Sequence, residues 1–339
     1  MGLKMYAVDV GFGYVKALKQ SPFPSVVVKT SYSSFFEKYD SVEVKEPFLI
    51  CFGEEKVFAL GQTAYSLTRN PTTMMDGYER WSTEEYEALL IGGIVKQMPK
   101  GDVSEEIVLV TGLPYLQSQS EDEVNGLMEH YTGNYEVVTI ENGQLVQKKL
   151  KIVDVHVLSQ PRGAYYSLLA LTGKKIKGEL ALIADLGFKS LDYLVTTDGQ
   201  ETDDSNGEDS IGGMERTYTD IIRGLRSKGL PAIKPHEFDY WYDKGKLAKY
   251  NTDIEKGFNQ AGKIIVADMK EKLGGFWDRV NAFGSIYFVG GSSQRLQQSL
   301  LKAIPTQNVF FSENSQQLIV EGFGAYGRAI MKKHYGGAL

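Results

Sequence analysis

Cysteine is almost absent from this chain, which has one, Cys51, among 339 residues. No disulfide can therefore form within the chain, and a reducing, cytoplasmic location is expected. Long apolar runs are absent too, and none approaches the ~18 residues that a membrane-spanning helix needs. The first ten residues lack the basic and apolar segments of a signal peptide. We therefore expect neither secretion nor direct membrane contact.

An excess of positive charge is also missing. Lys and Arg number 37 against 43 Asp and Glu, and the formal net charge is −6. A protein that coats nucleic acid needs a basic surface, so direct nucleic-acid binding is not expected. The four histidines are scattered and show no metal-ligand spacing. Two nucleotide motifs are missing as well, because the chain has neither a P-loop sequence nor the third glycine of a dinucleotide fingerprint.

Strand-like and helix-like segments alternate along the chain. Strands are expected at 4–10, 24–30, 47–53, 105–114, 135–141, 150–159, 180–187, 190–197 and 285–291. Helices are expected at 82–98, 161–171, 253–274, 292–304 and 322–336, and Ser82 with Glu85 predicts a capping box for the first. This alternation predicts an α/β fold. The length exceeds what one hydrophobic core usually supports and predicts two domains.

Two segments, residues 7–16 and 181–195, have related sequences. AVDVGFGYVK and ALIADLGFKSLDYLV both read as an apolar strand, an aspartate, an apolar residue, a glycine, a phenylalanine and a second strand. Aspartate and glycine are ordinary turn residues, so one such segment alone predicts only a β-hairpin. Two of them in separate halves of the chain suggest two similar domains that face one cleft.

Such hairpins suit the chemistry of a nucleotide. Glycine has no Cβ, so backbone N–H groups at Gly11 and Gly187 can approach phosphate oxygens closely. The carboxylates of Asp9 and Asp185 can hold the waters of a Mg²⁺ ion, which keeps most of its hydration shell. Lys16 can neutralise phosphate charge. The pair of hairpins therefore predicts a site for a nucleotide with Mg²⁺.

Five segments together resemble the motifs of the actin-like ATPase superfamily, in the same order. They are DVGFGYVK, LSQPRGAYYSL, ADLGFKSLDYL, FVGGSSQ and NSQQLIVEGFGAYG. The last of them is most similar to the ending of the ParM/StbA-type bacterial and archaeal actin-like proteins. The resemblance implies a duplicated, ribonuclease H-like fold with a nucleotide cleft between two domains. Domain I would span 1–165, with the helix 325–339 packing back on it, and domain II would span 166–324.

The resemblance assigns roles to residues at matching positions. The phosphate loops would comprise Asp9, Gly11, Phe12, Gly13, Tyr14 and Lys16, and Asp185, Gly187, Phe188, Lys189 and Ser190. The turns beside the nucleoside would comprise Gly212, Gly213, Gly290, Gly291 and Ser292. Gln160 would orient the attacking water, because an amide is a poor proton acceptor. Asp9 and Asp185 would act on Mg²⁺ through water. Small residues at Gly322, Gly324 and Ala325 would permit close helix packing.

The sequence departs from the family where serine or threonine is common in the phosphate loops. Phe12, Phe188 and Lys189 stand at those places, so contacts from side-chain hydroxyls would be lost while backbone contacts remain. The choice between ATP and GTP is therefore left open, as is the role of the acidic segment 198–209. The aromatic and basic stretch 239–250 is expected to pack as an edge of the second domain, where the family makes filament contacts.

The resemblance implies a filament-forming protein that hydrolyses Mg-ATP or Mg-GTP and drives plasmid or DNA segregation. Its partners would be further copies of itself and a DNA-binding adaptor at a centromere-like site. One alternative is a small-molecule kinase of the same superfamily, which needs a carboxylate base; Asp154 is the nearest in sequence, although KIVDVHV reads as a strand. Another alternative is a nucleotide-regulated binding protein that does not turn over its nucleotide.

Overall fold

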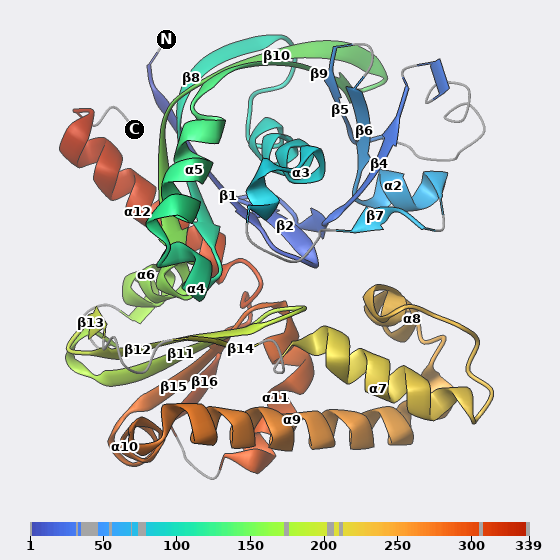
Figure 1. Cartoon of the computed structure of the whole chain (residues 1–339), viewed down its shortest axis with the longest axis vertical. Helices are drawn as coiled ribbons and strands as arrows, with labels where there is room; N and C mark the ends of the chain where they lie inside the picture. The colour runs from blue at the N-terminus through green and yellow to red at the C-terminus, as the bar shows by residue number, and fades with distance from the viewer. Residues whose placement is uncertain are drawn as a thin grey trace. The chain divides into compact units, whose positions relative to one another are not determined.

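The computed structural model describes residues 2–31, 33–34, 47–53, 56–68, 70–73, 79–172, 176–201, 207–209, 213–304 and 308–336. The chain forms two compact units (Figure 1). Unit 1 consists of Met1–Ser167 and Ile319–Leu339, and unit 2 of Leu168–Leu318. Among the described residues, no helix combines the length and apolar character needed to cross a membrane.

Unit 1 is built on a sheet whose described strands have the order β3-β2-β1-β8-β10-β9-β5-β6-β4-β7. These strands are β1 (Lys4–Val10), β2 (Tyr14–Ala17), β3 (Phe23–Pro24), β4 (Val26–Thr30), β5 (Leu49–Phe52), β6 (Lys56–Leu60), β7 (Thr72–Thr73), β8 (Val103–Leu113), β9 (Gly133–Glu141) and β10 (Gln144–Ser159). Every strand expected in this part of the chain is confirmed. The short strand β6 was missed, because its sequence KVFAL has no clear alternation of apolar and polar residues.

Helices cover both faces of this sheet. They are α2 (Gln62–Leu67), η1 (Arg80–Ser82), α3 (Glu84–Val95), α4 (Tyr115–Ser118), α5 (Glu121–Tyr131), α6 (Gln160–Thr172) and α12 (Leu318–His334). Alternate residues of β1 face opposite sides. Tyr6, Val8 and Val10 enter the core that contains α3. Met5 contacts Gly327 of α12, so Asp9 shares the face of the sheet that α12 covers.

The capping box expected at Ser82 and Glu85 is wrong by one residue. Thr83 is the N-cap of α3, and its side chain accepts a hydrogen bond from the backbone N–H of Tyr86 at 3.3 Å. Ser82 belongs to η1, and its hydroxyl donates to the Glu79 carbonyl. Both residue types serve as N-caps, so the sequence pattern alone did not distinguish them.

Glycines allow α6 and α12 to touch at their backbones. A Cβ added to Gly322 would lie 1.7 Å from the carbonyl oxygen of Gly163, a distance that no side chain tolerates. Close packing at Gly322 was expected from its size, and the structure identifies Gly163 as its counterpart. The first turn of α6, which carries Gln160, is fixed in place by this contact.

Unit 2 is built on a smaller sheet whose described strands run in the order β13-β12-β11-β15-β16, with β14 paired to β12. These strands are β11 (Leu180–Leu186), β12 (Leu191–Thr197), β13 (Gln200–Glu201), β14 (Gly207–Asp209), β15 (Ser285–Val289) and β16 (Val309–Phe311). The helices are η2 (Ile176–Gly178), α7 (Met214–Arg226), η5 (Pro235–Glu237), α8 (Phe238–Asp243), η6 (Ala248–Tyr250), α9 (Asn251–Leu273), α10 (Gly275–Phe283) and α11 (Gly291–Ala303). The core joins the sheet to α7, α9 and α11.

The structure also describes the surroundings of Cys51 and of the stretch 239–250. Cys51 is buried in β5, and burial raises the pKa of its thiol to about 11, which suits a packing residue and not a nucleophile. In the stretch 239–250, Tyr242 packs its ring against Phe238 and Phe258, and the side chain of Arg295 lies over the same ring. This stretch is thus an aromatic-packed edge of unit 2.

Candidate functional site

The first predicted hairpin is confirmed in unit 1. β1 and β2 are antiparallel, with Asp9 opposite Lys16 and Val10 opposite Val15. The turn closes with a hydrogen bond of 3.2 Å from the Gly11 N–H to the Tyr14 carbonyl. A Cβ on Gly11 would lie 2.8 Å from the Lys16 ammonium and 3.0 Å from that carbonyl. Glycine is therefore needed here by close approach, in the position where the sequence predicted it.

The second hairpin, in unit 2, repeats this geometry. β11 and β12 are antiparallel, with Asp185 opposite Asp192 and Leu186 opposite Leu191. The Gly187 N–H donates to the Ser190 carbonyl at 3.0 Å, and a Cβ on Gly187 would lie 3.0 Å from the same oxygen. The sequence repeat therefore corresponds to a repeat of backbone structure.

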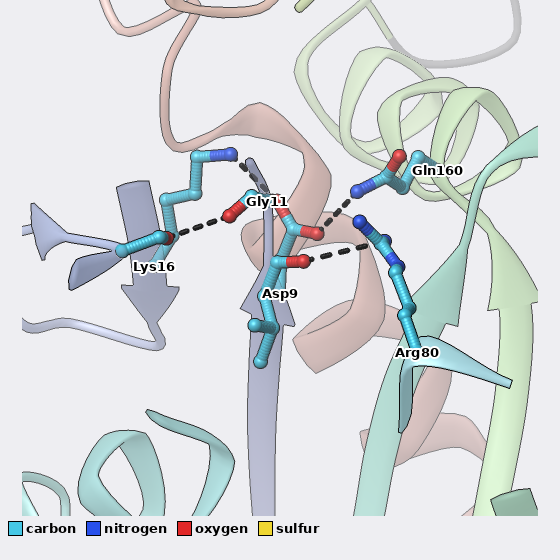
Figure 2. Close-up of polar contacts among 7 residues, drawn as sticks. Asp9, Gly11, Lys16, Arg80 and Gln160 are labelled. Atoms are coloured by element: carbon cyan, nitrogen blue, oxygen red, sulfur yellow. Dashed lines mark hydrogen bonds and ion pairs between the residues drawn. The ribbon is translucent and has the colours of Figure 1, made fainter. Parts of the chain in front are cut away.

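The Asp9 carboxylate receives two donors from distant parts of unit 1 (Figure 2). Asp9 is completely buried at the end of β1. The Lys16 ammonium donates to one carboxylate oxygen at 2.8 Å, and the side-chain amide of Gln160 donates to the other at 2.7 Å. Gln160 is the first residue of α6, directly after β10. The structure thus brings together three of the residues that the sequence selected.

Arg80 is a fourth member of this cluster, which sequence reasoning missed. Its guanidinium stacks over the Phe12 ring at 4.3 Å, and its Nη2 lies 3.4 Å from the Val10 carbonyl oxygen. Burial raises the pKa of neighbouring Tyr86 to about 12; the Arg80 charge opposes this shift, and the Asp9 charge adds to it. No motif marks Arg80, because it comes from η1, about 70 residues after the hairpin.

Ser25 supplies the hydroxyl that the first turn lacks in its own sequence. The Ser25 hydroxyl donates to the Gly11 carbonyl at 2.6 Å, and the Ser25 N–H donates to the Gly13 carbonyl at 2.9 Å. Ser25 follows β3, the strand paired with β2. Of the remaining residues expected in this loop, Phe12 covers Arg80, and Tyr14 is partly exposed.

The second hairpin carries a buried pair of carboxylates. Asp185 and Asp192 are 5% and 2% exposed. Residues directly opposite each other in an antiparallel pair have Cβ atoms ~5 Å apart, so the two side chains share one face of the sheet. Ser190 donates from its hydroxyl to Asp192 at 3.0 Å. The sequence analysis missed Asp192, although it follows Asp185 by the same interval that separates Lys16 from Asp9.

Two glycine turns pack against this hairpin within unit 2. Gly290 has a φ of +84°, and a Cβ there would lie 2.2 Å from an oxygen of Asp185. Ser292, in the first turn of α11, donates from its hydroxyl to the Gly187 carbonyl at 3.1 Å. A Cβ on Gly213 would lie 2.0 Å from the Lys189 carbonyl oxygen. Gly212 lies outside the described residues.

The first backbone N–H groups of α7 donate hydrogen bonds to the second hairpin. The N–H of Met214 donates to the Gly187 carbonyl, and that of Glu215 donates to the Phe188 carbonyl at 2.7 Å. These two amides are therefore unavailable to a ligand. The N-cap of α11 is Gly290, and Ser293 donates from its hydroxyl to the Gly290 carbonyl.

Asp154, the base that a small-molecule kinase would need, is engaged elsewhere in unit 1. Tyr335 donates from its hydroxyl to Asp154 at 2.6 Å, and His156 Nε2 lies 3.1 Å from the same carboxylate oxygen. The hydrogen bond to Asp154 raises the pKa of Tyr335 to about 12. The structure thus joins Asp154 to the end of the chain and gives no support to the kinase alternative.

Comparison with known proteins shows which proteins this chain is similar to. Residues 7–163 match the family described as "Actin like proteins N terminal domain". No curated protein matches the chain in sequence. Among solved structures, the actin-like protein Alp7A has a TM-score of 0.78 at 15% identity, with 99% of this chain and 98% of that chain covered.

Two further structures extend the match. A ParM subunit of a 15-stranded filament from Clostridium botulinum has a TM-score of 0.75 at 18% identity, with 97% of this chain and 100% of that chain covered. The archaeal actin homolog Ta0583 in complex with ADP has a TM-score of 0.73 at 18% identity, with 96% and 100% covered. At these identities the structures establish the fold. Residues 7–163 are therefore similar to the actin-like protein N-terminal domain, and the whole chain has the actin-like fold.

Proposed function

We propose that this chain binds Mg-ATP or Mg-GTP, hydrolyses it, and assembles with further copies of itself into filaments that move DNA. The observation that carries the proposal is the Asp9 carboxylate held between the Lys16 ammonium and the Gln160 amide at a glycine hairpin. Solved relatives supply the context, because one has ADP bound and others are filaments, among them a ParM and Alp12.

The contact with Asp9 fixes the orientation of the Gln160 amide. A carboxylate accepts hydrogen bonds, so the Gln160 nitrogen faces Asp9, and the amide oxygen is the group left to accept a hydrogen bond from water. An amide oxygen so placed can orient a water molecule for attack on a terminal phosphate. The Lys16 ammonium would also attract the negatively charged phosphate oxygens of the bound nucleotide.

The second hairpin fits a magnesium ion. Mg²⁺ takes oxygen ligands and retains several bound waters. These waters donate hydrogen bonds that buried carboxylates can accept. Asp185 and Asp192 offer such oxygens, and Gly290 has no Cβ, so the Asp185 carboxylate can lie directly against its backbone. We assign the ion's water shell to Asp9 and Asp185, with Asp192 added from the structure. The bound ion would neutralise charge on the phosphates during hydrolysis.

The expected DNA cargo requires a second protein. The net charge of −6 disfavours direct contact with the DNA backbone, so a DNA-binding adaptor at a centromere-like site would link filament and cargo.

The second turn of the nucleoside site, at Gly290, Gly291 and Ser292, would lie next to the second phosphate hairpin, because the Ser292 hydroxyl donates to the Gly187 carbonyl.

The first experiment is light scattering at 90° over a series of protein concentrations. Samples would contain Mg-ATP, Mg-GTP, the matching diphosphates or no nucleotide, with phosphate release followed in parallel. A rise that needs triphosphate and a threshold concentration, and then decays as phosphate appears, is expected. Flat scattering with every nucleotide, or hydrolysis equally fast below and above the threshold, would contradict the filament function.

A further inference from the structure

Arg80 is a buried cation that forms no ion pair with the residues that the structure describes. The residue is 3% exposed, and its Nε and Nη1 have no hydrogen-bond partner among the residues that the structure describes. These two nitrogens carry most of the N–H donors of the guanidinium, and arginine does not lose its proton in proteins. A buried charge costs several kcal/mol unless a partner compensates it. The missing partner therefore calls for an explanation.

Lys148 is a second buried cation, and its hydrogen-bond partners can be compared with those of Arg80. Its side chain is also fully buried, but its ammonium bonds Glu141 at 2.8 Å and the carbonyls of Pro99 and Gly101 at 2.7 and 2.6 Å. Every donor of Lys148 thus has an acceptor, including one carboxylate. Among the described residues, the Arg80 guanidinium has one hydrogen bond, the long contact to the Val10 carbonyl, and its other neighbours are the Phe12 and Tyr86 rings, which accept no ion pair.

The charges around the first hairpin favour an anion. Asp9 is already paired with Lys16 at 2.8 Å, so Arg80 leaves the cluster with one positive charge in excess. In Figure 2, the Arg80 guanidinium and the Gln160 amide lie on the same side of β1. If Gln160 orients the attacking water, this is the side at which the terminal phosphate would lie. Guanidinium groups are well suited to phosphate oxygens.

We propose that Arg80 binds the terminal phosphate of the nucleotide and makes the site prefer triphosphate over diphosphate. This inference rests on the proposed nucleotide function and adds a residue to it. Phe12 covers one face of the guanidinium at 4.3 Å. It occupies a place where the actin-like proteins that this chain resembles commonly have serine or threonine. The Phe12 ring is only partly buried at the tip of the hairpin, and the proposal requires it to turn aside as the phosphate enters.

The test compares Arg80→Gln and Arg80→Lys with the unchanged protein. Calorimetry would measure the affinities for Mg-bound AMP-PNP and GMP-PNP and for ADP and GDP. We expect Arg80→Gln to lose about 10- to 100-fold in affinity for the triphosphate analogue and to keep its diphosphate affinity within about 3-fold. Arg80→Lys keeps the positive charge without the planar guanidinium, so its triphosphate affinity should lie between those of Arg80→Gln and the unchanged protein.

Arg279→Gln is the matched control, because Arg279 also stacks on a phenylalanine, Phe276, at 4.9 Å, but belongs to α10 and not to either hairpin. An unchanged ratio of triphosphate to diphosphate affinity in Arg80→Gln would overturn the proposal. So would an equal loss of both affinities with a lower melting temperature, which indicates a structural role. If Arg80→Gln fails to fold, the ratio in Arg80→Lys decides. If the unchanged protein binds none of the four nucleotides, the proposed function itself fails.

Discussion

The two glycine hairpins have the same pattern of backbone hydrogen bonds and different charges. In both, a glycine N–H closes the turn on the carbonyl three residues ahead, at 3.2 Å for Gly11 and 3.0 Å for Gly187. In both, the aspartate lies opposite the residue seven positions later. That residue is Lys16 in the first hairpin and Asp192 in the second. In the first hairpin the Lys16 ammonium thus pairs with the Asp9 carboxylate, whereas the second hairpin places two carboxylates opposite each other.

This difference means that a repeated backbone presents different charges to its surroundings, which the proposed function assigns to two ligands of opposite charge. The first hairpin, with Lys16 and Arg80, is suited to phosphate. The second, with Asp185 and Asp192, is suited to a divalent cation. The two partners of a magnesium nucleotide would therefore be recognised by two copies of one structural element.

Gln160→Ala should have the largest effect, because the proposed function assigns the orientation of the attacking water to the Gln160 amide, which contacts Asp9 of the first hairpin. Phosphate release should slow by about 100-fold or more, in the range of a lost catalytic side chain. Scattering with a non-hydrolysable triphosphate should be unchanged, since binding does not require that water. Gln144→Ala, at an exposed position, is the control. Rapid phosphate release by Gln160→Ala would remove Gln160 from the mechanism.

Gly290→Ala should damage the second hairpin and leave the first intact. A Cβ would meet the Asp185 carboxylate at 2.2 Å, and the φ of +84° is unfavourable for alanine, so the free energy of unfolding should fall by about 2–4 kcal/mol. Gly274→Ala is the matched control, because Gly274 also has a positive φ but no atom within 4 Å of its added Cβ. Its loss should be about 1 kcal/mol. Equal losses in urea unfolding would show that the contact with Asp185 has no effect on stability.

Lys16→Met and Asp192→Asn should separate the roles of the two hairpins. Each change is expected to weaken triphosphate binding by roughly 10-fold, through phosphate charge in one case and magnesium in the other. Raising the magnesium concentration should restore binding to Asp192→Asn and not to Lys16→Met. Calorimetric titrations at several magnesium concentrations would measure this. Restoration of both variants, or of neither, would contradict the division of roles.

The sequence predicted the hairpins well because their signal is local. Asp9 and Gly11 are separated by one residue, and turn chemistry limits what such a pattern can form. Gln160 was found only through the order of motifs, and its contact with Asp9 spans 151 residues. Arg80 and Gly163 were not predicted, because each is defined by a partner from a distant segment and not by its neighbours in sequence. The capping box at Ser82 failed for a different reason, since two adjacent residues both suit an N-cap.

The smallest expected effect concerns the serine of each hairpin. Ser190 lies in the turn of the second hairpin and donates to Asp192, whereas Ser25 reaches the first turn from the segment after β3 and donates to the Gly11 carbonyl. Ser25→Ala should leave that buried carbonyl without its donor and reduce stability by about 1 kcal/mol. Ser190→Ala should cost a similar amount but also lower the magnesium affinity, because Asp192 loses a hydrogen bond. Urea unfolding and magnesium titration of both variants would test this, and a magnesium defect in Ser25→Ala alone would reverse the assignment of the two hairpins.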